Sequence, residues 1–198
     1  MPSPIAHSAL VLLARPAAGR DRLDRLPRSR RWGLYALVFA ALLAPDVDFL
    51  LGAIWPAELL DHGAAMHSLA VAGLFGGGFA LAGRLVAGPR LSWPLLWTLG
   101  AAAYASHLIM DALTWGGGVM LLWPLSAERV ASPVPLFYGA RHSQPWAWRA
   151  HLTTLMTESL VWMVMLVGLW GWRRLSGRRP SRGMIARPGV RRERGCGL

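Results

Sequence analysis

The chain has 198 residues, of which 54% are hydrophobic and only 16% are charged, and its mean hydropathy is +0.36. This composition is too apolar for an ordinary soluble domain and predicts a membrane protein. The net charge of +11 comes wholly from arginine, and the single cysteine, Cys196, excludes a disulfide or a cysteine-based metal site within one chain.

Four segments are long and apolar enough to cross about 30 Å of hydrocarbon as helices. In chain order they are residues 33–55, 67–88, 92–113 and 152–172. An earlier apolar run at 5–14 is too short to cross and precedes the charge, so it predicts a short helix rather than a cleaved signal peptide. We therefore expect an all-α fold: a polytopic helical membrane protein with about four full transmembrane helices plus a short N-terminal helix.

Glycines in the second long segment predict how it packs. Gly73 and Gly77 have the spacing of two small residues four apart, and Gly78 follows them. Such residues let the backbone of a neighbouring helix approach closely, so we expect another helix against this face.

The uneven distribution of arginine predicts the orientation of the helices. Seven arginines lie in residues 15–31, and the residues after Trp172 are again rich in arginine. Both regions are expected in the cytoplasm, which places residues 56–66 and 114–151 outside.

Composition also divides the chain into two parts. Residues 1–172 are predicted to form a helical membrane domain that carries a metal site, and residues 173–198 a basic, disordered cytoplasmic tail. A basic tail can bind nucleic acid or anionic lipid. After a membrane helix, however, we prefer the explanation that the arginines fix the orientation of the helix and that the tail is a disordered end. No nucleic acid partner is therefore expected.

Ionisable side chains in or beside the predicted helices converge on one membrane surface. Charged groups at such depth cost several kcal/mol unless they are paired or bound to a metal, so they are candidates for function. His107 and Asp111 are four residues apart and share one helix face. The other members of this set are His7, Asp46, Asp48, His62, His67, His151 and Glu158.

Each of these groups also has a purely structural interpretation. The two aspartates after Pro45 can mark a helix break and cap the next turn. The two histidines that follow can be interfacial, and the His107–Asp111 pair can simply lock two helices. Because nearly all the histidine and aspartate outside the arginine-rich loop falls at one depth, a joint metal site is preferred. Imidazole and carboxylate ligands suit zinc.

The order of the motifs resembles a known family. An early histidine is followed by P-D-x-D at 45–48, H-x4-H-S at 62–68, S-H-x3-D-x2-T-x-x-G at 106–117 and L-L-W-P at 121–124. Over residues 4–136, and weakly in the last helix, this order resembles the YdjM-like family of bacterial inner-membrane metal-dependent hydrolases. The chain departs from the family pattern at Gly63, Ala64 and Met66, so the resemblance supports His67 more strongly than His62.

The same order of residues is similar to the all-helical zinc-dependent phospholipase C and single-strand nuclease superfamily. That similarity implies two or three zinc ions. The predicted ligands are His7, Asp48, His67, His107, Asp111, His151 and Glu158. Asp46 is predicted to be the general base, although the roles of Asp46 and Asp48 can be exchanged.

We therefore expect a zinc-dependent hydrolase of the bacterial inner membrane that acts on a phosphoester at the outer leaflet, such as a lipid headgroup. Arg129, Arg141 or Arg149 can hold the phosphate. The alternatives are a non-catalytic metal-binding scaffold, a metal or proton conduit through Glu158, and an adaptor that recruits a cytosolic partner through the arginine-rich loop. Membrane lipids are the expected partners, and the sequence does not indicate which oligomeric state the protein has.

Overall fold

The computed structural model describes residues 23–55, 57–139 and 148–176. The regular elements of these residues are all helical, which confirms the predicted fold class. The α-helices are α4 (Arg28–Leu43), α5 (Val47–Ile54), α6 (Leu69–Ala87), α7 (Trp93–Ala112) and α8 (Trp148–Ser176). The 3-10 helices are η1 (Ala44–Asp46), η2 (Glu58–Leu60), η3 (Ala65–His67) and η4 (Gly88–Arg90).

Three helical stretches of the described chain are long and apolar enough to cross a membrane. They are Arg28–Ile54, Leu69–Arg90 and Trp148–Gly168, and they coincide with three of the four predicted spans. The fourth, α7, has 20 residues, which corresponds to a length of about 30 Å. It does not meet the same criterion of hydropathy, because its sequence includes two tryptophans, Pro94, His107 and Asp111.

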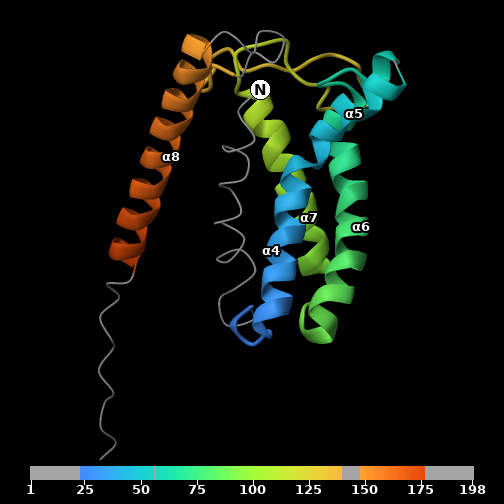
Figure 1. The fold of residues 1–198 in the computed structure, drawn as a ribbon, viewed down its shortest axis with the longest axis vertical. Coiled ribbons are helices and arrows are strands. Elements are labelled where there is room, and N and C mark those ends of the chain that lie inside the picture. The colour runs from blue at the N-terminus through green and yellow to red at the C-terminus, as the bar shows by residue number, and fades with distance from the viewer. Residues whose placement is uncertain (1–22, 56, 140–147, 177–198) are drawn as a thin grey trace, which may run out of the picture. The chain divides into compact units, whose positions relative to one another are not determined.

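Helices α4, α6 and α7 form the bundle that carries the candidate site. α6 and α7 are antiparallel and joined by a short turn, and α4 packs against both (Figure 1). Apolar side chains fill the interior of the bundle. Among them are Leu34, Leu42, Phe79, Leu96 and Leu99. Because α4 and α7 run in the same direction, the end of each lies beside the start of α6.

Glycines bring α6 and α7 close together, and Gly73, one of those that the spacing predicted, faces α7: its carbonyl accepts from the Trp97 indole N–H at 3.1 Å. A Cβ atom at Gly100 would lie 2.4 Å from the side chain of Phe79, and one at Gly83 would lie 2.8 Å from that of Leu96. By contrast, Gly77 and Gly78 face open space, so the prediction is wrong for these two. Since the six residues 73–78 hold four glycines, spacing alone does not identify the packed face.

Pro45 marks a break between α4 and α5. Proline has no N–H group to donate, and its ring clashes with the preceding turn, so a continuous α-helix cannot pass through it. Here α4 ends at Leu43, the 3-10 turn η1 follows, and α5 leaves the axis of α4 (Figure 1). This break occurs where the three helix ends meet.

The chain forms two compact units, residues Met1–Trp162 and Met163–Leu198. Within the first, the Thr154 hydroxyl donates to the carbonyl of Gly139 at 2.7 Å, and Trp162 packs against a small cluster around Met110. The described part of the second unit is the C-terminal portion of α8. The predicted boundary after residue 172 stays a prediction, and the short helix expected at 5–14 lies outside the described residues.

Candidate metal centre

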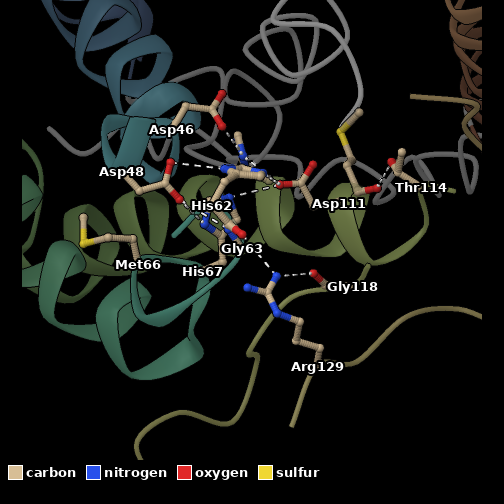
Figure 2. Close-up of polar contacts among 12 residues, drawn as sticks. Asp46, Asp48, His62, Gly63, Met66, His67, Asp111, Thr114, Gly118 and Arg129 are labelled. Carbon is tan, nitrogen blue, oxygen red and sulfur yellow. Dashed lines mark hydrogen bonds and ion pairs between the residues drawn. The ribbon is translucent and has the colours of Figure 1, made fainter. Parts of the chain in front are cut away.

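The helix ends of the bundle bring three aspartates and three histidines together. Asp46 and Asp48 come from the break after α4, His62 and His67 from the loop before α6, and His107 and Asp111 from the end of α7. Figure 2 shows that the labelled carboxylates and imidazoles point toward one another. Residues 65 positions apart in sequence therefore contribute to a single cluster.

Four of these residues form a compact group. Asp46, His67, His107 and Asp111 each offer one ligand atom, and these four atoms lie within 4.8 Å of one another. His107 Nε2 is 3.3 Å from Asp46 Oδ1 and 3.2 Å from Asp111 Oδ2, while His67 Nε2 is 3.1 Å from Asp111 Oδ2. Two imidazole nitrogens and two carboxylate oxygens therefore face a common point.

The second group shares His67 with the first. His67 Nδ1 is 3.0 Å from Asp48 Oδ2, and His62 Nδ1 is 3.1 Å from Asp48 Oδ1. Asp48 is completely buried, whereas the side chain of His62 is 25% exposed and its Nε2 lies 4.0 Å from Asp111 Oδ2. Each carboxylate oxygen of Asp48 thus contacts one histidine ring.

A backbone contact orients His107. Its Nδ1 lies 2.6 Å from the carbonyl oxygen of Leu42, the penultimate residue of α4. Since a carbonyl oxygen only accepts, Nδ1 must carry the proton, which leaves Nε2 free of hydrogen toward the carboxylates in the neutral ring. An outer hydrogen bond of this kind is the usual way in which proteins fix a metal-ligating histidine.

Gly63 allows the turn that brings His62 to Asp48. Its φ of +78° is favoured by glycine, and a Cβ atom there would lie 2.8 Å from an Arg129 guanidinium nitrogen and 3.0 Å from the carbonyl oxygen of Gly118. The Gly63 N–H donates to Asp48 Oδ2 at 3.4 Å. The Arg129 guanidinium donates to the carbonyls of His62 and Gly118 (Figure 2). Arg129 therefore clamps this turn to the following loop.

Opposing influences set the protonation of His67, which precedes α6. Burial by itself lowers the pKa of this imidazole, but the carboxylates of Asp111 and Asp48 outweigh burial and raise the pKa above its ordinary value of 6.5. The two carboxylates therefore stabilise the protonated imidazole of His67 when only protein groups surround it.

The donor set could hold a metal ion. His67 is fully buried, and although both of its ring nitrogens lie within 3.1 Å of a carboxylate oxygen, neither contact has the geometry of a hydrogen bond. Imidazole nitrogen and carboxylate oxygen are ligand types that zinc and other divalent metals take. The four-residue group offers one such atom from each residue.

The two ligand groups do not include the other predicted site residues, whose roles stay predictions. His7 lies outside the described residues. His151 and Glu158 are on α8, half-buried and buried respectively, and neither belongs to the two groups above. Sequence reasoning left the part played by His62 open, and the signal for it was the H-x4-H spacing with His67.

Of the three arginines expected to hold phosphate, Arg141 lies outside the described residues. Arg129 makes the backbone contacts already given, and the guanidinium of Arg149 lies 5.4 Å from the ring centre of Trp148. A phosphate contact for any of them stays a prediction.

Comparison with known proteins gives two matches along most of the chain. A family model described as YdjM inner membrane protein matches residues 3–187. The Escherichia coli (strain K12) inner membrane protein YbcI is 31% identical over 185 residues, which cover 88% of this chain and 99% of that protein. No solved structure gives a significant match.

Proposed function

Since this chain belongs to the YdjM inner membrane protein family, we propose that it is a zinc-dependent hydrolase of the inner membrane that acts on phosphoesters at the outer leaflet. The observation that carries this proposal is the group of Asp46, His67, His107 and Asp111, with its ligand atoms within 4.8 Å of one another. Three of the four residues are buried where their helices meet. Such a cluster is costly to bury without a bound cation.

Within this proposal, Asp46 is a ligand and Asp48 a positioning residue, the reverse of the sequence-based assignment. The support is geometric: Asp46 faces His107 Nε2, while Asp48 contacts the Nδ1 atoms of His62 and His67. A carboxylate on Nδ1 directs the opposite nitrogen of the ring toward the metal. When bound, zinc would act as a Lewis acid, and water in a coordination position that the protein leaves open would have its pKa lowered towards about 7.

The first test is metal content and turnover of detergent-purified protein. We expect wild type to retain zinc and to cleave phosphodiesters, including phospholipids. Asp46→Asn should lose zinc, whereas Asp48→Asn should retain it with about 10- to 100-fold weaker affinity, because only the orientation of a ligand is disturbed. Zinc-loaded protein that cleaves no phosphoester, ester or amide would contradict the hydrolase.

A second candidate function is a metal or proton conduit. Its support is Glu158, which is buried within the candidate membrane span of α8 and lies outside both ligand groups. Buried carboxylates in membrane helices are typical of ion and proton pathways. In sealed vesicles a conduit predicts zinc or proton flux that Glu158→Gln abolishes, and a hydrolase predicts no such flux.

A further inference from the structure

Helix α5 has an unusual distribution of polar and apolar residues. Of its eight residues, VDFLLGAI, only Asp48 is buried. Its large apolar side chains are exposed instead, and Ile54 and the following Trp55 are 80% and 74% exposed. The helix is therefore anchored to the protein through its carboxylate and presents its apolar side chains to the surroundings.

Lipid is the environment that suits this surface. Exposed apolar patches of such density are rare on proteins in water and mark contact with a membrane or a partner. Here α5 follows α4 and η1 within one candidate membrane span, Arg28–Ile54, so the same bilayer that surrounds α4 reaches α5. The apolar surface thus continues the lipid-facing surface of the bundle.

This lipid-facing helix touches the metal centre directly. The ring of Phe49 stacks on the imidazole of His62, with centroids 4.6 Å apart and planes 9° from parallel. Asp48, the preceding residue, contacts both His62 and His67. The exposed apolar residues Phe49 and Leu50 therefore directly follow a residue of the cluster.

A second apolar segment, residues 120–125, adjoins the turn at Gly63. The Met120 N–H donates to the carbonyl of Gly63 at 2.8 Å, and the Leu69 N–H donates to the carbonyl of Leu121 at 3.0 Å. In this segment Leu122 and Leu125 are exposed. Apolar side chains thus border the centre from two parts of the chain.

From these contacts we propose that α5 lies among lipid acyl chains and that the centre takes its substrate, a phosphoester carried by a membrane lipid, from the bilayer rather than from water. The choice of substrate rests on the proposed function, whereas the lipid contact of α5 does not. The two parts therefore need separate measurements.

The lipid contact is tested with single spin labels. In a Cys196→Ser background, labels at Leu50→Cys and Ile54→Cys should collide more often with oxygen than with a water-soluble nickel chelate. A label at Leu74→Cys, an exposed apolar residue of α6, is the lipid control, and one at the exposed Asp61→Cys is the water control. Labels on α5 that behave like the one at Asp61 would overturn the proposal, whether or not the protein is an enzyme.

The route is tested with two substrates that carry the same headgroup. Zinc-loaded protein in phosphatidylethanolamine and phosphatidylglycerol vesicles should cleave the bilayer phospholipid faster than the water-soluble glycerophosphodiester. The double variant Leu50→Ser with Ile54→Ser should lower bilayer cleavage by about tenfold and leave soluble cleavage and zinc content unchanged. The matched control is Leu85→Ser, because Leu85 is also 80% exposed but lies near the far end of α6.

Three outcomes of the second experiment are decisive. If the wild type cleaves both substrates equally, or if the double variant lowers the cleavage of both equally, entry from the bilayer is overturned. The hydrolase then still stands. Cleavage of neither substrate overturns the hydrolase and the route together, and the spin labels then decide the lipid contact alone. Selective loss of bilayer cleavage supports the route.

Discussion

His67 shows how one side chain connects the candidate centre to its supports. It is fully buried, its Nε2 faces Asp111 and its Nδ1 faces Asp48. The residue comes from the short turn η3, whereas its two partners come from α7 and α5. A change at this position therefore affects three elements at once, and the carboxylates around it are better places to test the site.

Removal of one carboxylate should empty the centre. We expect Asp111→Ala to release zinc while the protein stays inserted, because Asp111 Oδ2 faces both His67 and His107. The measurement is zinc per chain by mass spectrometry of the purified protein. Asp61→Ala is the matched control, since Asp61 is an exposed carboxylate of the neighbouring loop and should keep its zinc. Full zinc content in Asp111→Ala would refute the ligand assignment.

Zinc binding should release a proton from His67. The pKa of this residue is raised above 6.5 in the metal-free surroundings, so its protonated form contributes stability that is present below 6.5 and is lost as the pH rises through the raised value. Zinc requires the neutral ring, and so its affinity should rise over the same interval. Thermal unfolding is measured with zinc and with chelator between about pH 6 and 9. The increase in unfolding temperature that zinc causes, here called the zinc increment, should grow with pH. An increment that is constant with pH would contradict this account.

At the scale of the elements, the break at Pro45 explains why both aspartates of P-D-x-D reach the cluster. Residues two apart on an α-helix point about 200° apart, so a continuous helix would turn one of them away. The 3-10 turn η1 changes that relation, and Asp46 and Asp48 face different histidines. The proline, rather than the spacing, is the informative residue in this motif.

The close approach of α6 and α7 gives a prediction at the same scale. Gly100→Ala should lower the free energy of unfolding by about 1–3 kcal/mol, because the new Cβ atom would overlap the side chain of Phe79. Gly77→Ala adds the same methyl group where nothing lies within 4 Å, and it should be neutral or slightly stabilising. Unfolding in detergent, followed by circular dichroism, compares the two variants. Equal stability of both would exclude tight packing at Gly100.

For the whole molecule, arginine asymmetry predicts an even number of crossings between the two basic regions. Reporter fusions after Arg31, after Arg90 and after Arg174 should report the cytoplasm, and a fusion after residue 140 should report the outside. The antiparallel pair of α6 and α7 agrees with this arrangement. A cytoplasmic signal at residue 140 would mean that the bundle is inserted in the opposite orientation, and the centre would then lie on the cytoplasmic surface.

The helical class and the membrane location follow from composition and hydropathy, because long apolar runs report burial in lipid regardless of tertiary packing. The pairing of His107 with Asp111 likewise follows from helix geometry. The contacts of His62 do not, since they depend on the positive φ of Gly63 and on Arg129, a residue 67 positions away. The closely packed glycines, Gly83 and Gly100, do not follow from the sequence either, because the facing side chains Leu96 and Phe79 decide which glycines are packed.

The break after α4 has a consequence for the bilayer itself. With 16 residues, α4 alone is about 24 Å long, so the candidate span Arg28–Ile54 includes η1 and α5 as well. Because α5 departs from the axis of α4, its apolar side chains extend the hydrophobic surface to one side of that axis. The lipids beside the break must therefore pack around a bent hydrophobic surface and not around a straight helix.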